Sequence, residues 1–335
     1  MPKEREITYR EAVREAMVGS MRENEEVFLM GEDVGVYGGA FGVSRGMFEE
    51  FGEERVVDTP ISEAGYVGLC TGAALVGMRP IAEIQFSDFM THCMDQLVNQ
   101  AAKIRYMFGG EGRVPMVVRT PGGAGTGAAA QHSQSLEAWF VHTPGLKVVM
   151  PSTPYDAKGM LLSAIDDENT VIFYEHKLLY NKKGMVPEEP YRVPLGEANV
   201  TREGGDVTIV TAGLMHHYAL EAAEALADGG VEAEVVDLRT LSPMDDGAVR
   251  RSIEKTGRLI VVEEDVKTAG WGAEVVSRIV EGESFYSLDR APARVAGADV
   301  PIPYNRDLEA HVRPTPEKVV EAVRSLVDAR RGVYA

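Results

Sequence analysis

Residues 58–80 read DTPISEAGYVGLCTGAALVGMRP, and the rest of the chain is organised around this stretch. Pro60 favours an extended backbone at Thr59, and Ser62 is of a type that commonly caps the N-terminus of a helix. Mostly small and apolar residues follow, which predicts a helix over residues 62–78. Because a glycine costs a helix roughly 1 kcal/mol relative to alanine, we expect a neighbouring element to approach this helix closely.

Glu63 is the single charged residue in the predicted helix. It lies in the first turn, where a carboxylate complements the positive end of the helix dipole. The alternative is a buried carboxylate with a chemical function. The residue pattern alone leaves both interpretations open.

The composition excludes several classes of partner. The chain has 335 residues, enough for two domains, and a net charge of −18, which argues against nucleic acid or an anionic membrane as a partner. The first residues, MPKEREITYREA, are charged and do not resemble a signal peptide, and no apolar run is long enough to span a membrane. Cys70 and Cys93 lie in apolar helical patterns, so we expect reduced cysteines and a cytoplasmic location.

Strand and helix patterns alternate along the chain, which predicts an α/β fold with two doubly wound, mainly parallel-sheet domains. We expect the first domain over residues 1–180 and the second over 206–335. Residues 181–205 are rich in proline, glycine and charge, which predicts a linker. The expected strands are 27–30, 56–57, 80–86, 114–119, 146–150 and 171–174, then 207–210, 233–236, 259–262 and 294–296.

Two helix starts have local sequence signatures. Thr8 and Glu11 form a capping box that opens the first helix. Ser87 is expected to cap a long amphipathic helix over residues 88–107.

Two residues outside the central stretch are candidates for binding or catalysis. His132 follows a glycine-rich loop, where a histidine can act as acid, base or hydrogen-bond donor near neutral pH. A role in an interface hydrogen-bond network is equally open. Phe89 lies just past a predicted strand end, where ligands enter open α/β sheets, although packing in a helical core is the commoner use of phenylalanine. Adjacent His216 and His217 do not share a helical face, which favours structural roles.

Several familiar sequence signatures are missing. The chain has no GxGxxG, P-loop, HExxH, paired CxxC or GxSxG motif. Instead, DTPISEAG, RPIAEIQFSDF, DQLVNQAAK, AAAQHSQS, PGLKVVMPSTPYDAKG and VVDLRTLSP together resemble the beta subunit of the decarboxylating first component of 2-oxo acid dehydrogenase complexes, in the transketolase-like superfamily. The resemblance covers essentially the whole chain, with separate motifs in order at fitting spacings.

The resemblance implies an activity and a set of partners. Such subunits take part in thiamine-diphosphate-dependent decarboxylation of a small 2-oxo acid and reductive acylation of a lipoyl group. The segments QHSQSLEAWF and FYEHKLLY favour pyruvate, with the acetoin enzyme as the second candidate and the branched-chain 2-oxoisovalerate enzyme as the third. A non-catalytic scaffold subunit is the alternative from another class, but it has no need of both Glu63 and His132.

The family also divides the cofactor between two chains. The GDG motif that holds magnesium and the diphosphate does not occur in this sequence, and in the family it lies on an alpha subunit. The resemblance therefore implies an alpha-two, beta-two heterotetramer, with a dihydrolipoyl acyltransferase core and its lipoyl domain as further partners. We expect contact between beta chains through the helices predicted over 62–78 and 88–107, because small residues allow close packing.

Four residues match functional positions of the family. Glu63 matches the carboxylate that hydrogen-bonds the aminopyrimidine ring and favours its imino tautomer, and Phe89 matches the aromatic residue that packs on that ring. His132 matches a histidine at the active-site mouth that handles the intermediate or the lipoyl group. Glu32 matches an acidic position lining the interior between the two cofactors.

A potassium site is implied as well. Family members bind potassium through main-chain oxygens, at positions that match Met116, Ala164, Ile165, Asp167 and Asn169. Free carbonyls at a helix C-terminus suit a cation, although an ordinary helix end has the same sequence pattern.

Overall fold

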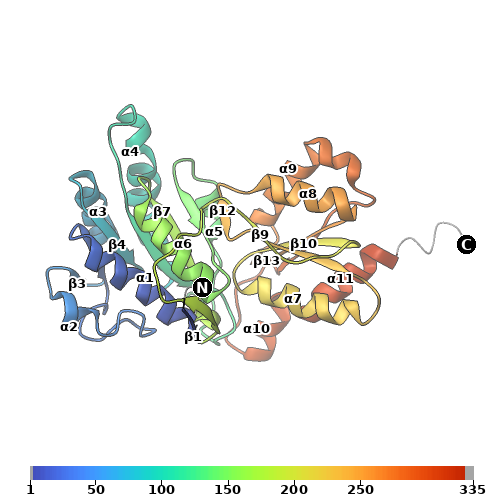
Figure 1. Cartoon of the computed structure of the whole chain (residues 1–335), viewed down its shortest axis with the longest axis horizontal. Helices are drawn as coiled ribbons and strands as arrows, with labels where there is room; N and C mark the ends of the chain where they lie inside the picture. The colour runs from blue at the N-terminus through green and yellow to red at the C-terminus, as the bar shows by residue number, and fades with distance from the viewer. Residues whose placement is uncertain (1–2, 329–335) are drawn as a thin grey trace, which may run out of the picture. The chain divides into compact units, whose positions relative to one another are not determined.

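The computed structural model describes residues 3–328, which divide into two units (Figure 1). The first unit comprises the chain up to Gly123 together with Trp139–Leu195. The second comprises Ala124–Ala138 and the chain from Gly196 onward. The short segment that carries His132 therefore belongs with the C-terminal elements and not with the strands that flank it in sequence.

A parallel sheet forms the centre of the first unit. Its strands run in the order β6-β7-β5-β4-β2-β3, and each neighbouring pair is parallel. Most strand residues are buried, as the near-continuous apolar sequences of a two-sided parallel sheet require. The bounds are β2 Val27–Gly31, β3 Val56–Asp58, β4 Arg79–Glu83, β5 Val117–Gly122, β6 Lys147–Val149 and β7 Val171–His176.

Helices and one antiparallel strand pair surround this sheet. The predicted capping box is confirmed, since the Thr8 side chain accepts from the Glu11 backbone and Glu11 accepts from that of Thr8. The helix that it opens, α1, packs against α6. The remaining bounds are β1 Glu4–Thr8, which pairs with β8 Lys183–Pro187, and α1 Tyr9–Glu23, α2 Met47–Phe51, α3 Glu63–Leu75, α4 Ala102–Met107 and α6 Pro154–Asp166. The short helix α5, Glu137–Val141, begins in the second unit and ends in the first.

The central helix, α3, is shorter than predicted. Ser62 occupies the N-cap position, but its side chain makes no capping hydrogen bond. The expected close approach to the glycines was wrong for contacts within residues 3–328: a side chain at Gly72 would meet nothing within 4 Å, and one at Gly68 would make only ordinary contact with Gln96. These glycines therefore leave an open face on α3.

The prediction of one long α-helix over 88–107 is wrong. The segment consists of a 3₁₀ turn at Ser87–Cys93, a π-helical turn at Asp95–Ala101 and then α4. Ser87 lies within the 3₁₀ turn and does not cap a helix. The buried residues Met90, Cys93, Leu97, Ala101 and Ile104 recur at intervals of three or four. That spacing suits all three helical forms, so periodicity could not distinguish them.

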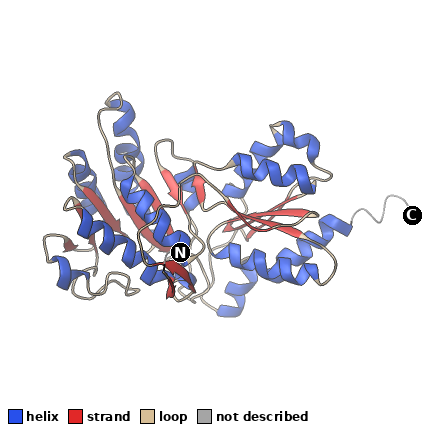
Figure 2. Ribbon diagram, viewed as in Figure 1, coloured by secondary structure: helices blue, strands red, loops and turns tan. Residues whose placement is uncertain are grey.

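The second unit is another α/β layer structure. Its strand order is β14-β13-β10-β11-β9, parallel except for the edge strand β9. Helices α8 and α9 cover one face, and α7 and α11 the other (Figures 1 and 2). The bounds are β9 Asn199–Arg202, β10 Val207–Thr211, β11 Ala233–Asp237, β12 Thr240–Ser242, β13 Leu259–Val266, β14 Ala293–Gly297, α7 Leu214–Ala227, α8 Asp246–Thr256, α9 Trp271–Val280, α10 Arg306–Val312 and α11 Pro316–Asp328.

The segment 181–205, expected as a linker, contains two strands. β8 pairs with β1 in the first unit, and β9 joins the sheet of the second. None of the helices within residues 3–328 is both long and apolar enough to cross a membrane.

Candidate functional site

Glu63 lies at the first position of α3, just beyond the carboxyl end of β3. Its side chain is buried, with 5% of the residue exposed. Oε2 lies 3.3 Å from Nδ1 of His92, which is largely exposed. A carboxylate that only complements a helix dipole can remain in water, so its burial beside an imidazole favours the functional interpretation.

Glu32 lies near Glu63 because β2 and β3 are parallel neighbours whose carboxyl ends share one edge of the sheet. Burial raises the pKa of Glu32, the negative charges of Glu63 and Asp33 raise it further, and His92 lowers it. Glu32 Oε1 is buried without a hydrogen-bond partner within the described part of the chain. The site thus holds two neighbouring carboxyl groups, one with an unused acceptor.

Three hydrogen bonds fix the loop that carries Glu32. The Gly35 N–H donates to Asp58 Oδ1 at 2.6 Å, and the Ser44 hydroxyl donates to the Val34 carbonyl at 2.6 Å. Gln85 Nε2 also donates to the Glu32 carbonyl, at 3.3 Å. The loop is therefore held by one internal hydrogen bond and by contacts from β3 and from the residues just after β4.

Phe89 adds an aromatic ring to the same group. It lies in the 3₁₀ turn that follows β4 and is half-buried. Its ring centroid is 5.7 Å from that of His92 and 6.4 Å from that of Phe86. The structure thus brings Phe89, Glu63 and Glu32 together through His92, a residue that sequence reasoning missed although it lies only three positions beyond the quoted motif RPIAEIQFSDF.

The surroundings of these carboxyl groups are poorly solvated. Burial raises the pKa of Tyr66, and the charges of Glu32 and Glu63 raise it further. Burial also raises the pKa of Cys93 to about 12, with Glu63 adding to the effect. Interactions between charges and dipoles are stronger in such a site than in water.

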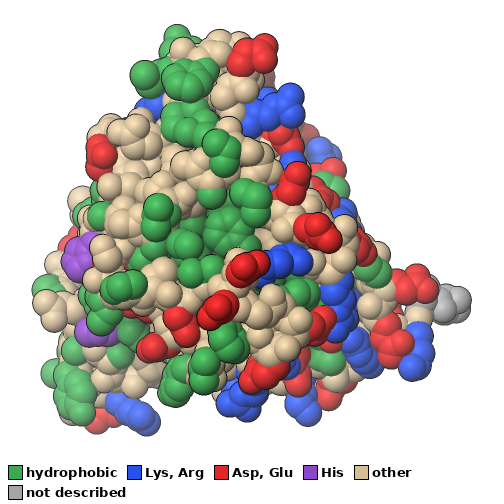
Figure 3. All heavy atoms as spheres, turned by 90° about the vertical axis from the view of Figure 1, so that its left-hand side faces the viewer, with side chains coloured by type: hydrophobic (Ala, Val, Ile, Leu, Met, Phe, Trp, Pro, Cys, Tyr) green, Lys and Arg blue, Asp and Glu red, His purple; other side chains and the backbone are tan. Residues whose placement is uncertain are grey.

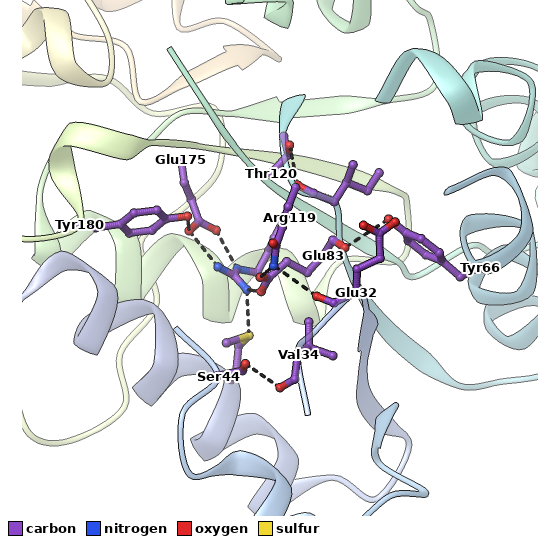
Figure 4. Close-up of polar contacts among 12 residues, drawn as sticks. Glu32, Val34, Ser44, Tyr66, Glu83, Arg119, Thr120, Glu175 and Tyr180 are labelled. Atoms are coloured by element: carbon purple, nitrogen blue, oxygen red, sulfur yellow. Dashed lines mark hydrogen bonds and ion pairs between the residues drawn. The ribbon is translucent and has the colours of Figure 1, made fainter. Parts of the chain in front are cut away.

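A buried ion-pair network braces the strands behind the site (Figure 4). Arg119 on β5 donates through Nε and Nη2 to the two oxygens of Glu175, at 2.7 and 2.8 Å, and through Nη1 to Glu83. Glu175 also accepts from the Tyr180 hydroxyl at 2.8 Å. Tyr66 donates to the Glu83 carbonyl at 3.4 Å. Charged residues inside the apolar strand sequences VVRT and VIFYEH were the only sequence sign of this network.

His132 belongs to the second unit, whereas Glu63, Glu32 and Phe89 belong to the first. It is half-buried at the end of the glycine-rich loop, and its backbone N–H donates to the Ala129 carbonyl at 3.3 Å. The contacts that hold this loop come from β13 and α10 of its own unit.

Four of the five carbonyls predicted to bind potassium have donors within the chain. Arg79 Nη1 donates to the carbonyls of Ile165 and Asp167, at 2.9 and 3.2 Å. The Met116 carbonyl accepts from Val171, and that of Ala164 from Asp167. The Asn169 side chain and backbone both donate to Asp167 Oδ1. Potassium would therefore have to share two of these oxygens with a guanidinium.

Comparison with known proteins identifies the family. Residues 5–183 match the transketolase pyrimidine-binding domain, and residues 196–319 the transketolase C-terminal domain. The chain is 48% identical to the acetoin:2,6-dichlorophenolindophenol oxidoreductase subunit beta and 46% identical to the 2-oxoisovalerate dehydrogenase subunit beta, both of Bacillus subtilis. These matches cover 96% of this chain and 98% and 99% of the relatives.

Two further comparisons point to the same family. The pyruvate dehydrogenase E1 component subunit beta of Rhizobium meliloti is 46% identical, over 96% of this chain and 70% of that protein. A solved structure described as a split gene transketolase, inactive beta4 tetramer, superimposes with a TM-score of 0.77 at 25% identity, covering 96% of this chain and 98% of the other. The chain therefore belongs to the transketolase-like family of 2-oxo acid dehydrogenase beta subunits.

Proposed function

We propose that the chain is the beta subunit of a thiamine-diphosphate-dependent pyruvate dehydrogenase that is active only with an alpha subunit. The substrate carboxylate leaves as CO₂, and the two electrons left behind reduce the lipoyl disulfide. The acyl group ends on one lipoyl sulfur, and the other sulfur becomes a thiol. The two cysteines are free and buried, which fits a reducing cytoplasm.

The observation that carries this proposal is the grouping of Glu63, Glu32 and Phe89 at one edge of the first sheet. An aminopyrimidine ring has an aromatic face and ring nitrogens that need hydrogen-bond partners. Phe89 offers a half-buried ring, Glu63 a buried carboxylate, and Glu32 an oxygen with no partner in residues 3–328. The residues therefore fit the pyrimidine half of the cofactor.

Glu63, Phe89 and His132 are each proposed to have a separate role. When bound, thiamine diphosphate supplies the carbanion stabilisation that decarboxylation needs. Glu63 holds a proton at a pyrimidine nitrogen, and its burial keeps water from competing for that bond. Phe89 orients the ring by packing against its face. His132 serves the acyl transfer to the lipoyl group as a hydrogen-bond donor or acid.

The alpha subunit is proposed to hold the diphosphate and magnesium, within an alpha-two, beta-two heterotetramer. Exposed apolar side chains support a large protein interface in the first unit: Leu69 is 64% exposed, Val76 82% and Tyr106 88%. Figure 3 shows hydrophobic side chains gathered on the face of the first unit that lies to the left in Figure 1. Such patches mark interaction sites, and the open glycines of α3 allow another helix to approach closely.

Potassium at the C-terminal end of α6 is a separate proposal, and Arg79 competes with it for two oxygens. A melting temperature of the heterotetramer that is higher in potassium than in sodium at equal ionic strength would support the site. Equal melting temperatures in potassium and sodium would contradict a potassium site.

The substrate requires a direct assay, because relatives named for three substrates are 46–48% identical to this chain. The heterotetramer is assayed with pyruvate, acetoin and 2-oxoisovalerate, using a lipoyl domain or an artificial electron acceptor. We expect the highest kcat/KM for pyruvate. Acetoin is the second candidate because the 48% identical relative is named for it. Activity with none of the three would contradict the proposal.

The task of His132 is tested in the same assay. His132→Ala should lower acyl transfer to the lipoyl domain on the order of 100-fold, the size of a typical acid–base contribution, and lower artificial-acceptor activity much less. The exposed neighbour Gln131 provides the control variant Gln131→Ala. Equal loss of both activities in His132→Ala would refute a lipoyl-specific role.

A further inference from the structure

The glycine-rich loop before His132 is bound by a carboxylate from a distant part of the chain. The Gly125 N–H donates to Glu309 Oε1 at 2.7 Å, and the Gly127 N–H donates to Glu309 Oε2 at 3.1 Å. Glu309 lies on α10 and is 2% exposed. Both oxygens of this buried side chain are therefore used by loop amides.

The backbone of the loop is shaped for this contact. Gly125 and Gly127 have φ angles of 103° and 70°, in the left-handed region that favours glycine. Successive backbone amides in such conformations form a concave anion-binding nest. Here an internal carboxylate fills the nest, and without it the amides would lose partly buried hydrogen bonds.

Two other acidic side chains hold the same segment. Glu264, at the end of β13, accepts from the Ala124 N–H at 3.1 Å. Its neighbour Asp265 accepts from the backbone of Ala138. Residues 124–138 are thus attached to the second unit near both ends, and Glu309 attaches the part closest to His132.

The chain from the nest to His132 is short and also constrained. Ala129 has a φ of 65°, and its carbonyl accepts from the His132 N–H. Only five peptide bonds separate Gly127 from His132, and Ala129–His132 form a turn. A displacement of the Gly127 backbone is therefore passed to the backbone of His132. The imidazole is also half-buried, which limits its freedom to compensate.

We propose that Glu309 is a positioning residue for His132: it fixes the glycine-rich loop so that the imidazole is held where acyl transfer requires it. This inference rests on the function proposed for His132. Glu309 itself acts on backbone amides and not on substrate. Misplacement of a catalytic group by about 1 Å can lower a rate by roughly 100-fold, so loosening the loop should be visible in the rate of transfer.

Three variants of the full heterotetramer test this role. Glu309→Gln keeps the size of the side chain but replaces one acceptor oxygen by an amide that cannot accept. Glu309→Asp keeps the charge but withdraws it by one methylene, so it provides a second test if the glutamine variant folds poorly. Glu321→Gln makes the same chemical change at an exposed position on α11 and serves as the control.

The first readout is hydrogen–deuterium exchange of residues 124–132, which does not depend on activity. Glu309→Gln should speed exchange on the order of tenfold, the effect of losing about one partly buried hydrogen bond, and Glu321→Gln should not change it. The second readout is transfer to the lipoyl domain. In Glu309→Gln, kcat should fall roughly tenfold or more while KM changes little.

A double variant separates the two proposals. In a His132→Ala background, Glu309→Gln should cause almost no further loss of transfer, because the group that it positions is gone. Unchanged exchange, or a full further loss in the double variant, would overturn the inference. If His132→Ala alone leaves transfer intact while Glu309→Gln still loosens the loop, the anchor stands and the role given to His132 falls.

Discussion

The two units contain buried acidic groups that manage charge in opposite ways. In the first unit, Glu83 and Glu175 both bind Arg119, so the carboxylates are paired with a cation. In the second unit, burial raises the pKa of Glu137, with Asp265 adding to the effect. Burial also raises the pKa of Asp265 to about 7. Arg119 lowers the pKa of Glu175 against the rise that burial causes, whereas the charges that act on Glu137 and Asp265 are those of other acids.

The difference matters because each group lies beside a proposed functional element. Arg119 braces strands whose ends carry the pyrimidine-binding residues. Asp265 accepts from the segment that carries His132. We therefore expect the strands braced by Arg119 to keep their geometry better than the segment that carries His132 as pH rises and the buried acids of the second unit ionise.

Removing Arg119 should have the largest effect. Arg119→Met leaves two buried carboxylates without their cation, which should lower the free energy of unfolding by about 3–5 kcal/mol. Arg22→Met is the control: Arg22 pairs with Glu50 at the surface, where solvent screens the pair, so its loss should change the free energy of unfolding much less. Urea unfolding of both variants makes the comparison. Similar losses of unfolding free energy in the two variants would show that the buried pair matters no more than the surface pair. They would remove the distinction between acids that are paired with a cation and acids that are not.

Glu63→Gln should abolish most activity with either acceptor. It keeps size but removes a preorganised electrostatic interaction, whose loss typically slows a reaction roughly 100- to 1,000-fold. Proton exchange of bound thiamine diphosphate, followed by NMR, should slow similarly. Glu49→Gln, at an exposed first-turn position of α2, controls for the helix dipole. Normal exchange in Glu63→Gln would restore the purely structural interpretation of this residue.

The acids of the second unit should give stability a pH dependence. The pKa of Asp265 in the folded chain is about 7, raised from 3.8, so the folded state binds more protons than the unfolded state between these values. The free energy of unfolding should therefore fall as pH rises from about 4 to about 7. Asp265→Asn should reduce this slope and stabilise the chain at pH 8 by about 1–3 kcal/mol, the scale of an uncompensated buried polar group.

The measurement is thermal or urea unfolding at pH 5 and pH 8. Asp307→Asn removes an exposed charge from the same unit and should leave the slope unchanged. A slope equal to that of the parent chain in Asp265→Asn would show that the buried acids do not control the pH response.

His92 should give the smallest effect. It touches Glu63 at 3.3 Å but is 61% exposed, so solvent screens the interaction. His92→Gln should lower artificial-acceptor activity only about two- to fivefold, equivalent to less than about 1 kcal/mol. His142→Gln, at another exposed histidine, should have no effect. A loss as large as that of Glu63→Gln would give His92 a direct part in the chemistry.

Local chemistry was predictable from the sequence, and the family resemblance supplied the residues of the candidate site. Thr8 and Glu11 are three residues apart, so their capping box needs no tertiary information. Glu63 and Phe89 were found through motifs, and the parallel sheet then brings both to strand ends. The alternation of strands and helices likewise predicted the α/β class.

Contacts between distant segments could not be read in the same way. Glu309 binds Gly125 across 184 positions, and Arg119 binds Glu175 across 56. No spacing rule links such residues before the fold is known. The periodicity over 88–107 was real, but it records burial and not the pitch of the backbone, so the 3₁₀ and π turns were missed.

The central claim is that this chain forms one half of a cofactor site. Calorimetric titration with thiamine diphosphate and magnesium tests it directly, using the isolated chain and the heterotetramer in parallel. We predict tight, magnesium-dependent binding by the heterotetramer and little or no binding by the chain alone. Tight, magnesium-dependent binding by the isolated chain would contradict the claim.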